Sequence, residues 1–150
     1  MLYKVVTLYS KTLFVYKLLM ENRPHTLSKS ERMSQKSLID NLFSGGNKSF
    51  SSFPLRVVYK ELETDKDIPR AMVLISVPKK NIKRAVMRNR VKRQVRDAYR
   101  KHKYLLLDEL EAKEKHLLVA FIWIHHDLNN STVVDQTVKN LLLHITEHIK

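Results

Sequence analysis

Cysteine is absent from this chain of 150 residues, glycine occurs twice and proline four times. Without cysteine the chain forms no disulfide and offers no thiolate to a metal ion or a substrate. That absence fits a reducing compartment, and we expect a cytoplasmic protein. The two glycines are adjacent, Gly45 and Gly46, so neither of the glycine-rich loops that cradle phosphates, GxxxxGK(S/T) and GxGxxG, is present.

Long apolar runs are absent as well, and no stretch of about 18 apolar residues could span a membrane. Acidic residues are scarce: 15 Asp and Glu stand against 28 Lys and Arg, which gives a net charge of +13. The acids are also scattered, so no cluster predicts a magnesium site held by the protein alone. Hydrophobic residues make up 43% of the chain, which is enough for a folded core. The length predicts a single domain.

The excess positive charge is concentrated in residues 79–103, KKNIKRAVMRNRVKRQVRDAYRKHK. This block contains twelve Lys or Arg and a single acid, Asp97, for a net charge of +11, so the other 125 residues carry only +2. Solvated surfaces normally mix charges of both signs. The block therefore indicates a polyanionic partner, nucleic acid or an anionic membrane surface, and we favour nucleic acid.

The same block predicts a helix from about Ile82, because it has no Gly or Pro and is rich in residues that favour helices. At about 3.6 residues per turn its apolar stripe comprises Met87, Val91, Val95, Ala98 and His102. The opposite side is predicted to carry Asn89, Lys92, Arg93, Arg96, Arg100 and Lys103, with Arg88 at one border and Arg90 and Lys101 at the other. Like charges four residues apart destabilise an isolated helix, and a polyanion would relieve that repulsion.

Around this block the sequence predicts an α+β fold, an α/β sandwich with helices on a small sheet, in the order α-β-β-α-(α)-β-α. Before the block we expect a helix over residues 35–44 with Ser34 as N-cap and a glycine stop, an extended region over 50–59, a polar turn over 63–69 and a buried strand over 71–77. After it we expect a helical stretch over 104–115, a second buried strand over 117–124 and a last helix capped by Ser131 or Thr132.

The first residues, MLYKVVTLYSKTLFVYKLL, are apolar but are interrupted by three lysines. A signal peptide has its positive charge first and then an unbroken apolar run, and this order is absent. We expect Met20 to be the biological start; the alternative is that residues 1–19 form an amphipathic segment packed on the domain. Residues 21–33 are expected to be a flexible basic arm. Residues 1–27 are therefore interpreted as an N-terminal extension and residues 28–150 as the domain.

No catalytic constellation is present in the side chains. His125, His126 and Asp127 follow a predicted strand and offer metal ligands, but a turn at the strand end is the simpler interpretation. His144 and His148 have the spacing of HxxxH without the Glu of an HExxH zinc site. The chemistry that these residues favour is binding.

Five arginines between positions 88 and 100 offer planar guanidinium groups that bridge phosphate oxygens or stack on bases. The amide of Asn89 can donate to a phosphate or accept from a metal-bound water, which its charged neighbours cannot do. Four aromatic residues between the start of the first predicted helix and the block are Phe43, Phe50, Phe53 and Tyr59, and any that are exposed beside it can stack on unpaired bases. Tyr59 is the best candidate, because its hydroxyl favours a half-exposed place. Core packing is the alternative for each.

Residues 84–100, RAVMRNRVKRQVRDAYR, resemble the signature of the bacterial ribonuclease P protein component, centred here on Arg88-Asn89-Arg90. The resemblance extends over most of the chain. SERMSQKSLIDNLFSGG is similar to the first helix of that family and its glycine stop, and FPLRVVY to its early strand. AMVLISVPKK is similar to the strand and basic turn before the signature, and LLVAFIWI with the final helix to the closing elements. Residues 1–27 lie outside the resemblance.

The resemblance implies a small α/β sandwich with a left-handed βαβ crossover, against the usual right-handed rule. It implies a protein subunit of ribonuclease P, an endoribonuclease in which a large catalytic RNA carries the catalysis and holds the Mg2+ ions. The implied substrate is precursor tRNA, whose 5′ leader the protein binds and the holoenzyme removes to make the mature 5′ end. The implied partners are the catalytic RNA and precursor tRNA, and no membrane and no DNA are expected.

Matched residue by residue, the resemblance implies an RNA-binding set of Lys79, Lys80, Arg84, Arg88, Asn89, Arg90, Lys92, Arg93, Arg96 and Arg100. A leader cleft between the first helix and the sheet would include Ile39, Phe43 and Tyr59. Ile39 is a departure, because this family position is often aromatic and an aliphatic side chain cannot stack as a ring does. No catalytic residue is expected in the protein, and no direct metal ligand, with Asn89 as an outer-shell contact. Residues 61–70 have no clear counterpart in the family.

Two other classes of protein fit a basic helix: a structural ribosomal protein or RNA chaperone, and a DNA-binding regulator that places the helix in a major groove. The regulator is disfavoured, because it requires a helix-turn-helix pair and predicted strands flank the basic helix here. A cleavage assay with the catalytic RNA at low magnesium separates the other two, since only a ribonuclease P subunit stimulates cleavage of the precursor.

Overall fold

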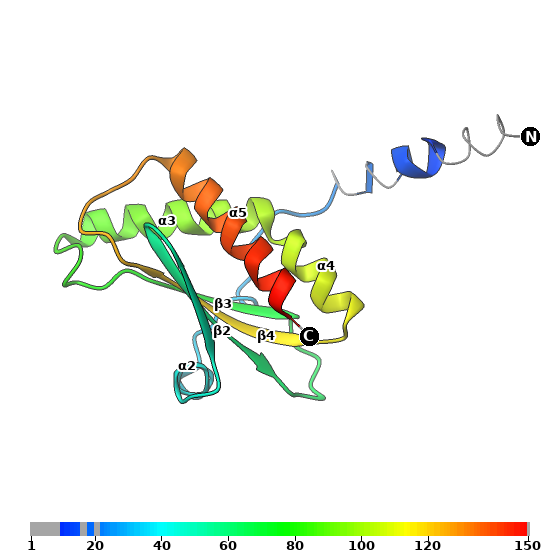
Figure 1. The fold of residues 1–150 in the computed structure, drawn as a ribbon, viewed down its shortest axis with the longest axis horizontal. Helices are drawn as coiled ribbons and strands as arrows, with labels where there is room; N and C mark the ends of the chain where they lie inside the picture. The colour runs from blue at the N-terminus through cyan, green and yellow to red at the C-terminus, as the bar shows by residue number, and fades with distance from the viewer. Residues whose placement is uncertain (1–9, 16–17, 20–21, 150) are drawn as a thin grey trace, which may run out of the picture.

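The computed structural model describes residues 10–15, 18–19 and 22–149 (Figure 1). Its elements are α2 (Lys36–Phe43), β1 (Lys48–Ser52), β2 (Leu55–Leu62), β3 (Ala71–Ser76), α3 (Ala85–His102), α4 (Tyr104–Ala112), β4 (His116–Trp123) and α5 (Ser131–His148). This is the α+β fold that the sequence predicts, and the element order is consistent with the predicted one. The region expected to be extended over 50–59 is a hairpin of two strands, β1 and β2.

The four strands form one sheet in the order β1-β2-β4-β3. β2 pairs antiparallel with β1 and β4, whereas β3 pairs parallel with β4. A parallel pair needs a crossover connection, and α3 and α4 supply it between β3 and β4. The left-handedness of this crossover stays a prediction.

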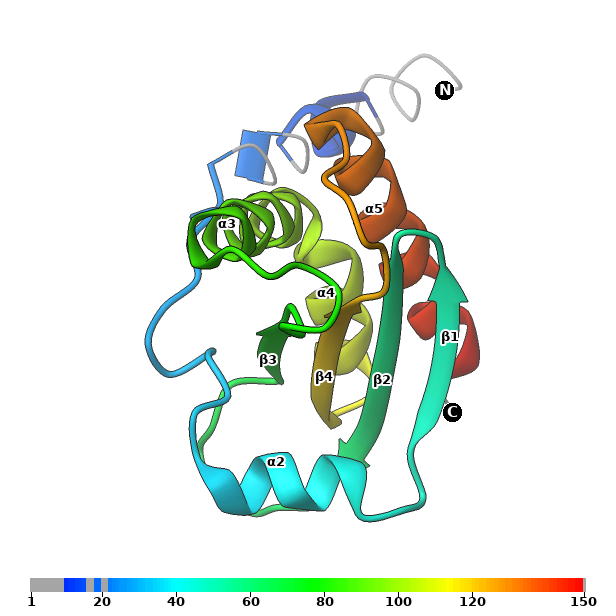
Figure 2. The same cartoon turned by 90° about the vertical axis from the view of Figure 1, so that its left-hand side faces the viewer.

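Helices cover both faces of the sheet, with α3, α4 and α5 on one face and α2 on the other (Figure 2). Successive residues of a strand point to opposite faces, so a strand that is covered on both sides is apolar throughout. In β2, for example, Val57 faces the three helices while Val58 faces α2. The larger core lies under the three helices and includes Phe121 and Trp123, both fully buried. The sheet therefore separates the basic helix α3 from α2.

The N-caps of two helices differ from the predicted ones. Gln35 rather than Ser34 is the N-cap of α2, and its side chain makes no capping hydrogen bond. Asn130 rather than Ser131 or Thr132 is the N-cap of α5, and its Oδ1 accepts a hydrogen bond from Thr132 N at 2.9 Å. Asn caps a helix as well as Ser does, so the chemistry is as expected and the position is shifted by one residue.

The glycine pair ends α2 as predicted. Gly45 and Gly46 have φ angles of 118° and 69°, in a region that residues with a Cβ rarely adopt. The chain leaves the helix at this point and enters β1.

Residues 23–33 are packed against the domain, although the sequence predicts a flexible arm there. Leu27 is buried in the larger core, and Met33 is buried in the core under α2. Arg32 forms an isolated parallel bridge with Val73 of β3. The prediction of a flexible arm is therefore wrong for these residues, because two apolar side chains in a polar stretch are enough to anchor it.

The segment before this arm is described only in part. Residues 10–15 are helical, and their Leu13 and Phe14 are exposed. Met20, the expected biological start, lies outside the described residues. None of the helices in the described ranges is long and apolar enough to cross a membrane.

Candidate nucleic-acid interface

Helix α3 has the apolar back that the sequence predicts. The buried stripe comprises Val91, Val95 and Ala98, with Met87 partly buried beside them. His102 lies at the end of this stripe, where its Nε2 is 3.0 Å from Asp135 Oδ2 of α5. These contacts fix which side of the helix faces solvent.

Tyr99 widens the buried side of α3 beyond the predicted stripe. It is fully buried, and its hydroxyl has no hydrogen-bond partner among the described residues. Burial, and secondarily the charge of Glu31, raises the pKa of the Tyr99 hydroxyl, so it stays neutral. The signal in the sequence was its place four residues after Val95, one turn along the buried side.

The front of α3 leaves its cations in solvent. In the predicted RNA-binding set, the exposed residues are Lys79, Lys80, Arg84, Asn89, Arg90 and Arg93, and the half-exposed residues are Arg88, Lys92, Arg96 and Arg100. Arg100 pairs with Asp97 on its own helix. Arg90, Arg93 and Arg96 form no ion pair with any residue that the structure describes. Their charges are therefore available to a polyanion.

Arg88 is partly engaged within the protein. Its Nη1 donates to the backbone carbonyl oxygens of Ile82 at 3.0 Å and Lys83 at 2.6 Å. These carbonyls precede the first turn of α3, so Arg88 closes the loop that leads from Lys79 and Lys80 into the helix. The sequence predicts Arg88 at a border of the cationic side, and from that position it can hold these two carbonyl oxygens.

Lys103 is not on the cationic side, where the sequence predicts it. Only 4% of the residue is exposed. Its Nζ lies 3.0 Å from Glu31 Oε1 and donates to Thr26 O at 2.6 Å. That prediction is wrong, because a helical periodicity cannot show that residues 23–33, distant in sequence, cover the end of the helix.

A second surface forms on the α2 side of the sheet. Phe43 of α2 is 46% exposed, and Ile39, one turn before it, is half-buried. The alternation of β2 places the exposed Arg56 on the same side. Lys60 ties the helix to the sheet, since its Nζ donates to Asn41 O at 3.0 Å and to Asn41 Oδ1 at 2.9 Å. The sequence analysis did not identify Arg56 and Lys60. The pattern that could have shown them is their spacing of four residues in a mostly apolar strand, which places both on one face of the sheet.

Tyr59 does not belong to this second surface. It is 4% exposed and packs in the larger core, on the opposite side of the sheet from α2. Strand alternation groups Tyr59 with Leu55 and Val57, and burial raises the pKa of its hydroxyl. The predictions that Tyr59 is half-exposed and lines a cleft with Ile39 are therefore wrong.

Three of the histidines that the sequence singles out, His125, His144 and His148, pack against other aromatic rings. His144 stacks on Phe50 with ring centroids 3.7 Å apart and on His148 at 4.1 Å. His125 meets Phe53 edge-on at 4.7 Å. Burial, and then the neighbouring His148, lower the pKa of His144. In the described part of the chain, no group of three or more His, Asp or Glu side chains is placed to hold a metal ion.

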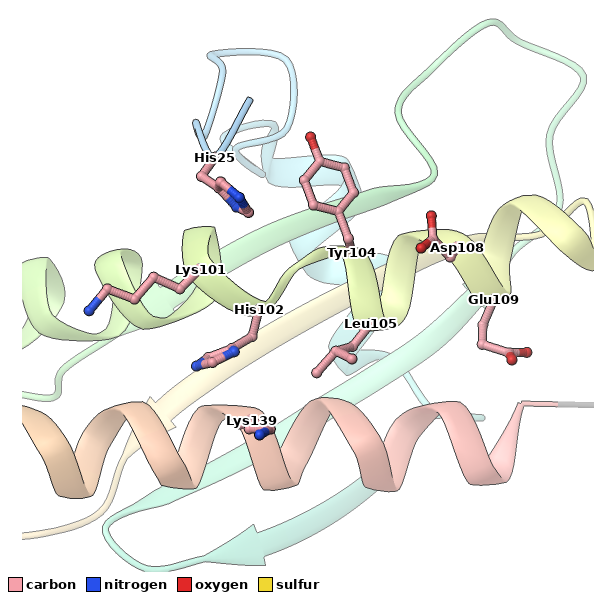
Figure 3. A pocket seen from close by; sticks show the side chains of 8 residues that line it. All are labelled: His25, Lys101, His102, Tyr104, Leu105, Asp108, Glu109 and Lys139. Atoms are coloured by element: carbon pink, nitrogen blue, oxygen red, sulfur yellow. The ribbon is translucent and has the colours of Figure 1, made fainter. Parts of the chain in front are cut away.

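A cavity of about 500 Å³ lies between the end of α3, α4 and α5 (Figure 3). Its lining residues are His25, Lys101, His102, Tyr104, Leu105, Asp108, Glu109 and Lys139. Several are engaged with protein groups: Lys101 and His102 with Asp135, and Asp108 with Arg23. No residue of the predicted RNA-binding set or leader cleft lines this cavity.

In the part of the chain that the structure describes, one helix of a small α+β fold presents arginines without ion-pair partners. These features place the protein in the class of basic proteins whose cationic surface is built on a single helix. Comparison with known proteins narrows this class. The Ribonuclease P family model matches residues 27–145. The ribonuclease P protein component of Porphyromonas gingivalis strain W83 is 39% identical over 123 residues, which cover 82% of this chain and 88% of that protein. The protein component of Chlorobium phaeobacteroides is 37% identical over 107 residues, 67% of this chain and 73% of that protein.

The chain belongs to the ribonuclease P protein component family. It is thus a protein subunit of ribonuclease P and takes part in an endoribonuclease activity of tRNA processing, in a ribonucleoprotein with an RNA partner.

Two solved structures agree with this in fold. A Staphylococcus aureus RNase P protein, described as a mutant with defective mRNA degradation activity, superposes with a TM-score of 0.60 at 21% identity, covering 89% of this chain and 96% of that chain. The RNase P protein from Thermotoga maritima superposes with a TM-score of 0.59 at 19% identity, covering 75% of this chain and 96% of that chain.

Proposed function

We propose that the protein binds the catalytic RNA of ribonuclease P through the front of α3 and the 5′ leader of precursor tRNA through the α2 side of the sheet. It thereby assists magnesium-dependent removal of the leader, which makes the mature 5′ end. The observation that carries the proposal is the row of guanidinium groups on α3, those of Arg90, Arg93 and Arg96, which reach solvent and have no ion-pair partner among the described residues, in a chain of this family. We place this complex in the cytoplasm and expect no DNA partner.

The front of α3 suits a folded RNA because the helix that carries its cations is held in place by the core. Arg90, Arg93 and Arg96 follow one another at intervals of three residues, so they project from one side of the helix. Val91 and Val95 hold the other side in the core. Guanidinium groups bind phosphate oxygens in pairs of parallel hydrogen bonds, and a rigid helix lowers the entropy that this contact costs.

Mg2+ is expected to be held mainly by the RNA, where it supplies charge stabilisation at the cleaved phosphate. The one acid of the basic block, Asp97, is paired with Arg100 and is not offered as a ligand. Asn89 is exposed between Arg88 and Arg90, and its amide oxygen can accept a hydrogen bond from a metal-bound water. The protein residues therefore fit an outer-shell contact at Asn89.

The α2 side of the sheet suits a single strand. Single-stranded RNA binds where exposed rings stack on bases and nearby cations meet the backbone. Phe43 supplies a ring and Arg56 supplies a cation on the same side of the sheet. Ile39 adds an apolar contact, which is weaker than a stacked ring.

The test is cleavage of precursor tRNA by the cognate catalytic RNA at low magnesium, with and without the protein. We expect the protein to raise the cleavage rate and to bind leader-bearing precursor more tightly than mature tRNA within the complex. Absence of stimulation would favour a structural ribosomal protein or an RNA chaperone instead.

A further inference from the structure

Lys103 is the only buried cation of the basic block, and its contacts are unusual for a lysine. Its side chain is 5% exposed and that of its partner Glu31 is 13% exposed. Glu31 also accepts hydrogen bonds from Ser28 N at 2.8 Å and from Ser28 Oγ at 2.9 Å. Both charges are therefore desolvated and satisfied by groups of the protein.

A buried ion pair of this kind contributes little net stability. The loss of hydration offsets the attraction, and replacing both partners by uncharged residues of similar size is often neutral or stabilising. Such a pair can instead fix the relative position of the two segments that carry it, because its two charges are stabilised only in a narrow range of arrangements.

One end of the pair lies at the junction of α3 and α4, where Lys103 is the single residue between the two helices. The other end lies in residues 23–33, which we call the strap. The strap also makes an ion pair and three hydrogen-bond contacts with the junction: Arg23 Nη1 with Asp108 Oδ1 at 2.7 Å, Tyr104 Oη donating to Pro24 O at 2.6 Å, His25 Nδ1 with Arg100 O at 3.1 Å, and Lys103 Nζ donating to Thr26 O. Figure 3 shows His25 beside Tyr104, and their ring centroids lie 5.6 Å apart in an edge-on arrangement.

The strap is fixed to the sheet at its other end. Val73 N donates to Glu31 O at 2.8 Å, and Met33 N donates to Val73 O at 2.9 Å, so the strap extends the outer edge of β3. Gln35, two residues after Met33, is the N-cap of α2. Glu31 therefore lies between the end of α3 and the start of α2.

We propose that Lys103 and Glu31 are positioning residues, whose ion pair sets the place of α2 relative to α3. In this way the pair holds the leader surface at a fixed place relative to the RNA-binding surface. The inference rests on the proposed function, because it requires that α3 binds the catalytic RNA while the α2 side binds the leader. Phe43 is the last residue of an eight-residue helix, so a small rotation at the start of α2 displaces its ring.

The test replaces both charges at once, with the double variant Lys103→Met/Glu31→Gln. The net charge of the protein is unchanged, so general attraction to RNA is preserved. The measured quantity is leader discrimination, the ratio of holoenzyme affinities for precursor and mature tRNA, together with the thermal midpoint of the free protein. The matched control is Arg70→Met/Glu111→Gln, which removes an ion pair of 2.9 Å that lies outside both proposed surfaces.

We expect the Lys103/Glu31 double variant to unfold near the wild-type temperature while leader discrimination falls by about two- to thirtyfold, the range for disrupted coupling between sites. The control should keep its discrimination. If the double variant folds poorly, Glu31→Asp keeps both charges with a shorter reach and should give an intermediate loss.

If the folded double variant, or Glu31→Asp where that variant is needed, keeps the leader discrimination of the wild type, the inference is overturned and the proposed function is not affected. An equal loss of affinity for precursor and mature tRNA would also overturn it, since the pair would then act on the fold in general. A wild-type holoenzyme with no leader preference would overturn the proposed function, and this inference with it.

Discussion

At the scale of single residues, the structure separates cations that face solvent from cations that hold the fold. Arg90 is exposed and unpaired among the described residues. We expect Arg90→Ala to weaken binding to the catalytic RNA and to reduce the slope of log affinity against log salt by about 1, because one phosphate contact is lost. The free energy of unfolding should change by less than about 0.5 kcal/mol. RNA binding at several salt concentrations and unfolding by urea measure the two effects.

Arg88→Ala is the matched comparison for that variant. Arg88 holds two backbone carbonyls, so its loss should cost about 1 kcal/mol of stability in addition to RNA affinity. If Arg90→Ala destabilised the protein as much as Arg88→Ala, the assignment of Arg90 to the solvent side would be wrong.

Tyr99 provides a residue-scale test of the core. Its buried hydroxyl lacks a partner among the described residues, and such a group costs about 1–3 kcal/mol. Tyr99→Phe should therefore leave the free energy of unfolding unchanged or raise it, with RNA affinity unaltered. A clear loss of stability in urea unfolding would show that the hydroxyl is satisfied in solution.

Glu31 predicts a pH dependence of stability. Burial alone would raise the pKa of Glu31, but hydrogen bonds from Ser28 N, Lys103 and the Ser28 hydroxyl, with the charge of Lys103, outweigh it, so the pKa lies below its ordinary value of 4.5. A lowered pKa means that the stabilisation is present above that ordinary value and is lost as pH falls through the folded-state pKa. The stability difference between wild type and Glu31→Gln should accordingly shrink below pH 4.5, in urea unfolding at a series of pH values. A difference that is constant with pH would contradict this.

At the scale of elements, α2 and β1 offer two exposed phenylalanines on opposite faces of the sheet. Phe43 lies on the α2 side, whereas Phe50 stacks on His144 of α5. We expect Phe43→Ala to lower holoenzyme affinity for leader-bearing precursor by about 1–3 kcal/mol, the usual value of one stacked base, and to spare mature tRNA. Phe50→Ala should change neither affinity. Equal effects of the two variants, in binding titrations, would remove the leader surface from α2.

The elements that the sequence predicted well are those with strong local patterns. The apolar run of residues 71–77 and that of 117–124 became β3 and β4, and the amphipathic block became α3 with the expected back. Local spacing decides such elements, because a period near two or near 3.6 residues needs no knowledge of the rest of the chain. The glycine stop after α2 followed from backbone sterics in the same way.

What the sequence could not give depends on contacts between distant residues. Lys103 fits the cationic periodicity of α3, yet Glu31 lies 72 positions away and draws it inward. Tyr59 has a hydroxyl that favours a surface place, but the register of β2 turns it toward the three helices. The side of α3 that faces solvent was therefore predictable from local spacing as far as Arg100, whereas the composition of the α2 surface required the pairing of the strands.

At the scale of the whole molecule, the sheet divides the protein into a side that carries α3 and a side that carries α2, as Figure 2 shows. The proposed RNA-binding surface lies on the former and the proposed leader surface on the latter. The strap is the part of the chain that contacts both the α3–α4 junction and the edge of β3. A subunit arranged in this way can contact a catalytic RNA and its substrate at once.

The absence of cysteine allows the orientation of the whole molecule on RNA to be measured directly. Val86 is 77% exposed on the first turn of α3, outside the proposed binding set, and Gln136 is exposed on α5. A hydroxyl-radical probe attached to Val86→Cys or to Gln136→Cys cleaves only the RNA near its own position. In the assembled holoenzyme we predict strong, localised cuts in the catalytic RNA from position 86 and weak or no cuts from position 136. Cuts from position 136 alone, or identical patterns from both, would contradict the claim that the front of α3 faces the catalytic RNA.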